Sequence, residues 1–144
     1  MVERGIQAAH VVKASAEDIG WLYPGHDAED VARRWHRLGV ALVVITDGEK
    51  GATAFTATGP PLHRPGRAVQ LVDTVGAGDS FTSGLLAALV RRGKHTPSSL
   101  ATCTAPELLS VLDDAITVSA ITCERVGANP PTLAELAPTG WGTG

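Results

Sequence analysis

The sequence has little of several features that mark particular protein classes. It holds only two cysteines in 144 residues, Cys103 and Cys123. They form no CxxC pair and have no histidine at metal-ligand spacing, so we expect neither a disulfide nor a zinc site. No apolar run reaches the roughly 18 residues that span a bilayer, and the start of the chain shows no signal-peptide pattern. We therefore expect a protein of the cytoplasm.

A surplus of basic charge is also missing. The chain has 12 Lys and Arg against 15 Asp and Glu, which gives a net charge of −3. Its three tryptophans stand without a basic stripe beside them, so they indicate packing rather than base stacking. These features argue against nucleic acid or an anionic membrane as a partner. The 44% of hydrophobic residues suits one globular domain.

The apolar pattern that is present alternates strands with helices. The expected strands cover 8–12, 41–46, 52–57 and 68–72. The expected helices cover 15–22, 27–38, 81–92 and 106–123, with a polar connector at 93–104. The run 41–46 is continuously apolar, which is typical of a strand covered on both faces. The order of elements predicts an α/β fold with a mainly parallel sheet flanked by helices.

A glycine-rich segment, DTVGAGDSFTS at 73–83, joins the last expected strand to the next helix. Such a loop commonly binds phosphate, because free backbone N–H groups and the positive end of the helix dipole both point at the anion. The dinucleotide pattern GxGxxG fails here because Phe81 stands where its third glycine would be. A Walker loop fails as well, because no Gly-Lys-Ser/Thr follows.

Asp79 places a carboxylate inside this loop, and two interpretations are open on these residues alone. In the first, Asp79 caps the helix and the glycines only make a tight turn. In the second, the carboxylate is a base that takes the proton from an acceptor hydroxyl, while amides stabilise the charge on a transferred phosphoryl group. In that second case we expect Gly78→Val to weaken nucleotide binding, because a branched side chain would stand where the phosphate meets the backbone and would penalise any positive φ, and we expect Gly66→Ala, in a loop, to be mild by comparison.

The residues 73–81 together with Gly84 resemble the second signature of the PfkB (ribokinase-like) carbohydrate kinases. The likeness continues in 12–25, which is similar to bacterial fructokinases, in 44–52, which is similar to the loop that covers ATP, and in the closing segment 122–131. The resemblance implies the C-terminal half of a three-layer ribokinase-like fold. It also implies a fructokinase-like enzyme that transfers phosphate from ATP, with Mg²⁺, to a sugar hydroxyl.

The resemblance further assigns roles to single residues. Asp79 matches the catalytic base. The amides that match the anion hole belong to Gly76, Ala77 and Gly78. The positions that fall in the nucleotide loop are Thr46, Gly48 and Gly51. The positions that align with loops for a monovalent cation such as K⁺ are Asp73, Val75, Gly127 and Ala128.

The magnesium side departs from the family pattern. Many members carry Asn-x-x-Glu there, whereas this chain has Ser15 and Asp18 at the same spacing, with Glu17 as the alternative acid. Asp is one methylene shorter than Glu, so its carboxylate reaches less far toward a metal ion. A helix cap with solvated acids explains the stretch equally well.

The half of the family that binds the sugar has no counterpart in this sequence, which shows no Gly-Gly pair before the glycine-rich segment. We therefore expect 1–137 to be the ATP-binding part of a kinase domain without its sugar site and lid, and 138–144 to be a flexible tail. Alone, it should bind ATP–Mg weakly, phosphorylate no sugar, and self-associate or form a homodimer through an unpaired sheet edge. The alternatives are a non-catalytic nucleotide-binding remnant and a nucleoside kinase of the same fold.

Overall fold

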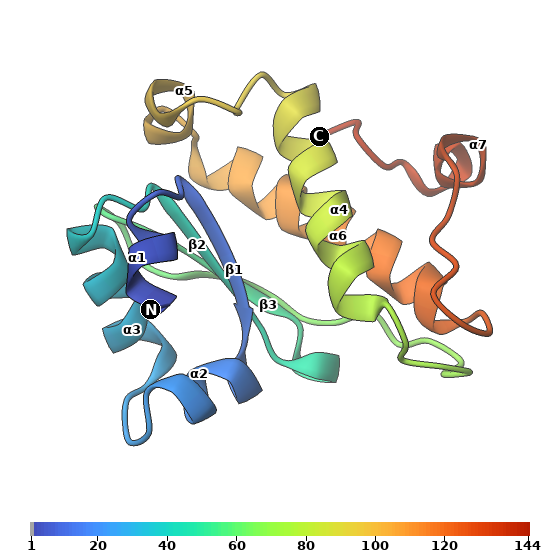
Figure 1. The fold of residues 1–144 in the computed structure, drawn as a ribbon. Coiled ribbons are helices and arrows are strands. Elements are labelled where there is room, and N and C mark those ends of the chain that lie inside the picture. Colours follow the sequence, from blue (N-terminus) through green and yellow to red (C-terminus); the bar gives the residue numbers. More distant parts are fainter. Residues whose placement is uncertain (1) are drawn as a thin grey trace.

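The structure is a computed structural model that describes residues 2–144, so Met1, the first residue of the expected domain, lies outside the described residues (Figure 1). The helices are α1 Val2–Ile6, α2 Ala16–Leu22, α3 Ala28–Arg37, α4 Ala77–Arg91, α5 Pro97–Ala101, α6 Ala105–Cys123 and α7 Leu133–Leu136. Two 3₁₀ turns are η1 Gly48–Lys50 and η2 Ala137–Thr139. The strands are β1 Val11–Ser15, β2 Leu42–Thr46, β3 Ala52–Thr56 and β4 Leu62–Arg64.

The four strands form one sheet in the order β1-β2-β3-β4. β1 and β2 are parallel, with Val11 opposite Leu42, whereas β2 and β3 are antiparallel, with Leu42 opposite Thr56. The pair β3–β4 is antiparallel as well. The α/β class is therefore confirmed, but the described sheet is mixed rather than mainly parallel. The short turn after β2 explains this, because a parallel connection needs a crossover of about a dozen residues or more.

Side chains of β2 alternate between two hydrophobic cores, one on each face of the sheet. Leu42 and Val44 belong to the core shared with α4 and α6. Val43 and Ile45 belong to the core shared with α2 and α3. Figure 1 shows α4 and α6 on one side of the sheet and α2 and α3 on the other. The prediction that this strand is covered on both faces is confirmed, and the helices and the sheet make three layers.

Two predictions about strands were wrong. The first strand begins at Val11 rather than at residue 8, because residues 8 and 9 close the unexpected helix α1 through bonds to Gly5 and Ile6. The segment 68–72 is not a strand: the N–H of Val72 donates to the carbonyl of Cys123 at 2.9 Å instead of joining a ladder. An apolar run becomes a strand only where a neighbouring strand can pair with it.

The connections hold more structure than the sequence indicated. The polar connector 93–104 contains α5, which Thr96 and Ser99 cap reciprocally. The proline-rich loop around residue 62 contains the short strand β4. The last residues return to the end of α4, where the carbonyl of Gly144 accepts a hydrogen bond from Arg92 Nε at 2.9 Å. Within residues 2–144, the helices are too short or too polar to cross a bilayer.

Candidate nucleotide site

A cavity of about 330 Å³ opens between the end of β2, the segment after β4, the start of α4 and one face of α6. Its lining is largely apolar, with a few polar groups among the apolar side chains, which is usual for small-molecule sites. Five of the residues assigned from the resemblance line it: Thr46, Gly48, Gly51, Ala77 and Gly78. The sequence places these residues in two segments some 30 positions apart, and the fold brings them to one cavity.

The first turn of α4 forms one wall of this cavity. Gly76 is the N-cap residue with a left-handed φ of 77°, and no side chain caps the helix. The N–H of Ala77 donates to the carbonyl of Thr74 at 3.2 Å, so this amide of the expected anion hole already has an acceptor. Across residues 2–144, no acceptor pairs with the N–H groups of Gly78 and Asp79. These two amides are the donors that an anion can reach.

Asp79 is the third residue of α4 and is exposed. The interpretation of Asp79 as the helix cap was wrong, because that position belongs to Gly76. The carboxylate has neither a hydrogen bond nor an ion pair with any residue between 2 and 144. It lies beside the cavity rather than among the residues that line it. A carboxylate in the first turn lies where the helix dipole favours negative charge.

The glycines differ from what the sequence suggested. Positive φ is needed at Gly76 and not at Gly78, which is helical. A Cβ on Gly76 would also lie only 2.6 Å from Cβ of Ala128, whereas one on Gly78 would meet only Lys13 Nζ, at 3.4 Å. Gly66 is not an ordinary loop glycine, because a Cβ there would overlap the carbonyl of Glu49.

The nucleotide loop closes tightly against the segment after β4. Gly51 has a φ of 103°, and a Cβ on it would overlap the backbone of Arg64. The carbonyl of Gly51 accepts a hydrogen bond from the N–H of Asp47 at 2.9 Å. Glycine at this position therefore lets two chain segments come together at the mouth of the cavity.

The residues assigned to a monovalent cation are also brought together. The carboxylate of Asp73 accepts hydrogen bonds from the N–H groups of Val75, at 2.9 Å, and Gly127, at 3.0 Å. These backbone hydrogen bonds lower the pKa of Asp73 below its ordinary value. Ala128 is the neighbour of Gly76 described above, so the loop before α4 and the loop after α6 form one unit.

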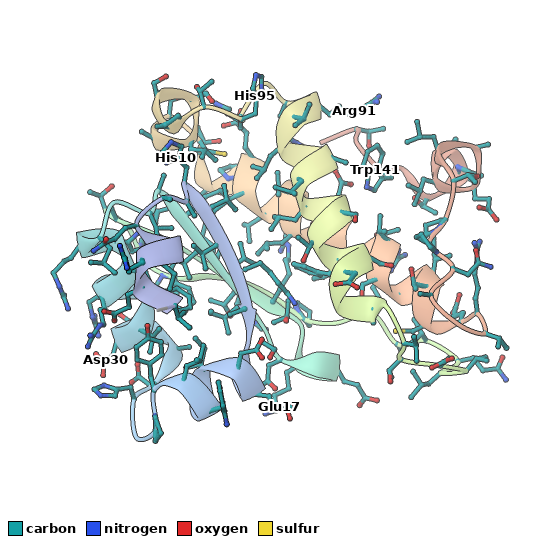
Figure 2. All side chains as sticks on the ribbon, viewed as in Figure 1. His10, Glu17, Asp30, Arg91, His95 and Trp141 are labelled. Atoms are coloured by element: carbon teal, nitrogen blue, oxygen red, sulfur yellow. The ribbon has the colours of Figure 1, made fainter. Side chains whose placement is uncertain are left out.

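Ser15 and Asp18 form a reciprocal cap at the start of α2. The N–H of Asp18 donates to Ser15 Oγ at 3.0 Å, and the N–H of Ser15 donates to Asp18 Oδ2 at 2.9 Å. Hydrogen bonding of the Asp18 carboxylate to Ser15, above all to its backbone N–H, lowers the pKa of Asp18. Glu17 lies exposed on the same turn (Figure 2). Between residues 2 and 144, no three His, Cys, Asp or Glu side chains converge as metal ligands.

Sequence reasoning missed several residues at the cavity. Ser119 Oγ donates to the carbonyl of Ala77 at 3.0 Å and fixes the start of α4 on α6. Arg67 Nη1 donates to Thr117 Oγ1 at 2.9 Å at the edge of the lining. The helical spacing of Ile116, Ser119, Ala120 and Cys123 marks one face of α6, and that face lines the cavity. In Figure 2, His10 and His95 lie at the end of the molecule opposite Glu17.

Comparison with known proteins shows which family model the chain matches. The model of the pfkB family of carbohydrate kinases matches residues 1–134. A fructokinase of Rhizobium leguminosarum bv. trifolii is 40% identical over 88 residues, which are 61% of this chain and 27% of that protein. A fructokinase of Klebsiella pneumoniae is 36% identical over 108 residues, which are 74% of this chain and 34% of that protein. The chain thus spans about a third or less of the length of these relatives.

Solved structures share the fold. The fructokinase of Vibrio cholerae with fructose, ADP and calcium ion superposes with a TM-score of 0.71 at 31% identity, over 88% of this chain and 39% of that chain. The fructokinase of Xylella fastidiosa with bound ATP superposes with a TM-score of 0.83 at 26% identity, over 96% of this chain and 44% of that chain. The aminoimidazole riboside kinase of Salmonella enterica, complexed with its riboside and an ATP analogue, gives a TM-score of 0.70 at 29% identity, over 88% and 40% of the two chains.

Proposed function

Because the chain belongs to the pfkB family of carbohydrate kinases, we propose that residues 1–137 form the nucleotide-binding and catalytic-base part of an ATP-dependent sugar kinase. The observation that carries the proposal is the convergence at one cavity of Thr46, Gly48 and Gly51 with the first turn of α4, where two amides lack acceptors. Such amides at the start of a 15-residue helix favour a phosphate group.

The lining divides the nucleotide into two parts. Phosphate oxygens would accept hydrogen bonds from the N–H groups of Gly78 and Asp79. The base and ribose would pack on the apolar side, which includes Leu71, Phe81 and Cys123. Leu71 is 57% exposed without a ligand, so a bound base would cover apolar surface that otherwise faces water.

Asp79 would act as the base toward the acceptor hydroxyl. It lies in the turn that would hold the terminal phosphate, so the hydroxyl that it deprotonates would sit beside the phosphorus. The unpaired amides would then stabilise the charge that develops on the phosphoryl oxygens.

The donor set near α2 fits a magnesium ion, because Mg²⁺ needs only one or two carboxylates besides phosphate and water. One oxygen of Asp18 is outside the reciprocal cap, and Glu17 is exposed. Bound there, Mg²⁺ would offset the negative charge of the phosphates. A K⁺ ion would be held by carbonyls of the loops that contain Val75 and Ala128, since Asp73 already accepts two N–H groups.

The acceptor is proposed to be a sugar such as fructose. Relatives named fructokinase carry this choice, and the relative named aminoimidazole riboside kinase, 35% identical over 91 residues, supports a nucleoside as the second candidate. A purely nucleotide-binding, non-catalytic role is the third. β1 is an edge strand of the described sheet, and we propose that the isolated chain self-associates there.

Nuclear magnetic resonance titration of the 144-residue chain tests the nucleotide site directly. ATP with Mg²⁺ should shift the backbone amide signals of Gly78, Asp79 and Gly51, and fructose alone should not. Unchanged signals at millimolar ATP would reject the site. The transfer reaction is tested in a chimera, in which residues 1–134 replace the matching part of the Vibrio cholerae fructokinase. Phosphorylation of fructose by the chimera would support a catalytic role for residues 1–134, and its absence would favour the non-catalytic role. The choice between a sugar and a nucleoside needs a panel of acceptors assayed with this chain joined to its own acceptor-binding half, because the acceptor site of the chimera is that of the fructokinase.

A further inference from the structure

Lys13 occupies an unusual place for a cation. It lies in the middle of β1, opposite Val44 of β2, and is half-buried. Its Nζ is 6.0 Å from the centre of the Phe81 ring and would be 3.4 Å from a Cβ on Gly78. The ammonium group therefore faces the first turn of α4, beside the amides that have no acceptor.

One part of this placement is unfavourable, because the ammonium group faces the positive end of a helix, although the charge of Asp18 attracts it from a distance. The N-terminal end of a helix carries partial positive charge and repels a cation. The other two lysines have carboxylate partners, Lys50 with Asp47 at 2.9 Å and Lys94 with Glu107 at 3.4 Å. Lys13 has no carboxylate within 4.0 Å in the described part of the chain. The ring of Phe81 lies at the limit of a cation–π contact and compensates little.

Two kinds of hydrogen-bond donor thus face the same region from opposite sides. The sheet contributes an ammonium group, and the first turn of α4 contributes backbone amides. A ligand with several negatively charged oxygens would satisfy both at once and would turn the repulsion into attraction. Asp18 is close enough for its charge to feel Lys13, yet its hydrogen bonds go to Ser15. Lys13 is therefore available to a ligand.

We propose that Lys13 binds the terminal phosphoryl group of the nucleotide and positions it on the first turn of α4. The inference rests on the proposed function and adds a residue that neither the glycine-rich segment nor the nucleotide loop contains. Lys13 would hold oxygens of the phosphoryl group on the side of the sheet, while the N–H groups of Gly78 and Asp79 hold them on the side of the helix.

The test compares Lys13→Met with Lys13→Arg and with Lys94→Met, which removes the same charge from an ion pair near the far end of α4. Binding of tripolyphosphate, ATP and adenosine to the whole chain is followed by titration of amide signals. Lys13→Met should weaken the binding of tripolyphosphate and of ATP by roughly 10- to 100-fold, as expected for a lost charge-assisted hydrogen bond. The affinity for adenosine should stay unchanged. Lys13→Arg should stay within about threefold of the unsubstituted chain.

The outcomes are separable. Equal ATP affinity in Lys13→Met and the unsubstituted chain overturns the inference and leaves the nucleotide site intact. An equal loss for adenosine overturns it too, because it would show a structural role. If the unsubstituted chain binds none of the three probes, the proposed function fails first. Thermal unfolding checks the fold: Lys13→Met should unfold at the same or a higher temperature, since it removes a repulsion, and Lys13→Gln serves if the methionine variant aggregates.

Discussion

The polar groups at the two ends of α4 differ in whether they have partners within the protein. At its C-terminal end, Arg92 Nη1 pairs with Asp114 Oδ2 at 2.9 Å, and both side chains are only 9% exposed. Asp114 Oδ1 accepts a hydrogen bond from the N–H of Gly142 at 2.9 Å. Arg91 lies over the ring of Trp141, with 5.7 Å between the guanidinium carbon and the ring centre. Both residues are labelled in Figure 2. The charged side chains at this end hold α4, α6 and the last residues together.

At its N-terminal end, polar groups are left without partners. Asp79 is exposed and unpaired, Lys13 has no carboxylate, and the N–H of Gly78 has no acceptor in the described chain. A buried ion pair with further hydrogen bonds is typical of structural sites, whereas converging unpaired groups beside a cavity are typical of ligand sites. We therefore expect one end of the helix to matter for stability and the other for ligand binding, and four predictions test this difference.

Asp79→Asn should have the largest effect, and only on catalysis. Asparagine keeps the shape of the side chain but cannot accept the proton of the acceptor hydroxyl. In the chimera described above, turnover should fall by roughly 10²- to 10⁴-fold, the range for a positioned general base. ATP affinity and the unfolding temperature should change little, because Asp79 has no partner in residues 2–144.

A remote control is Asp30→Asn on α3, which breaks an exposed ion pair with Arg33. Its turnover should equal that of the unsubstituted chimera. If Asp79→Asn also kept normal turnover, the base would have to be another group, and the unpaired state of Asp79 would carry no functional meaning.

Asp114→Asn should have the opposite profile, with a large effect on stability and none on nucleotide binding. It leaves the buried guanidinium of Arg92 without its charge partner, and Arg92 Nη2 already lacks a hydrogen-bond partner. Breaking a buried pair in this way costs about 3–5 kcal/mol in the free energy of unfolding. Urea unfolding measures the loss.

The matched control replaces both members, Arg92→Met with Asp114→Leu, since removing both charges avoids the unpaired guanidinium. This double variant should recover most of the stability. A single Asp114→Asn variant as stable as the unsubstituted chain would show that the ion pair does not hold this end.

Alanine at each of two glycines of the same turn should change the free energy of unfolding by about 1 kcal/mol, in opposite directions. Gly78 is helical and open on its Cβ side except for Lys13. Gly78→Ala should therefore raise the free energy of unfolding by roughly 0.5–1 kcal/mol. The same substitution should weaken the binding of ATP. Gly76→Ala should lower the free energy of unfolding by about 1 kcal/mol or more, because alanine disfavours a φ of 77° and its Cβ would crowd Ala128.

Chemical denaturation and ATP titration of the two variants give the comparison. Equal signs for the stability change in Gly76→Ala and Gly78→Ala would contradict the assignment of the left-handed residue. Gly66→Ala, which the sequence presents as a mild loop change, should instead be disruptive, because its Cβ overlaps Glu49.

Local patterns in the sequence predicted much of this molecule. The periodicity of 27–38 and 106–123 gave α3 and α6 to within a residue or two at each end. The continuous apolar run gave β2, and Ser15 with Asp18 gave the cap of α2. These features depend on neighbours in the chain, and so the sequence alone suffices for them.

The predictions that failed concern features that depend on residues distant in the sequence. The run 68–72 is as apolar as a strand, but the N–H of Val72 donates to the carbonyl of Cys123 at the end of α6, a long-range contact that periodicity cannot predict. Gly66 appears ordinary until the fold places Glu49 against it. Ser119 carries no motif, and Lys13 belongs to the segment 12–25, whose resemblance assigned it no role. The packing of β1 and α6 against α4 puts both residues at the site.

The smallest predicted effect is a pH dependence at the paired end. Glu107 caps α6 and accepts a hydrogen bond from the N–H of Thr104 at 2.8 Å, and Lys94, just beyond α4, pairs with it. The hydrogen bonds from Thr104, with the charge of Lys94 as a lesser cause, lower the pKa of Glu107 below its ordinary 4.5. Because the folded state binds this proton less readily than the unfolded state, the charged carboxylate stabilises the fold fully above about pH 4.5, and this contribution is lost as the pH falls toward the lower, folded-state pKa. Unfolding of the unsubstituted chain and of Glu107→Gln should therefore differ at pH 6, and the difference should shrink as the pH falls from 4.5 to 3. A difference that grew over this range would mean that the cap opposes folding. A difference independent of pH would mean that glutamine loses packing rather than charge, and the charge of Glu107 would then contribute nothing to the stability of the far end of α4.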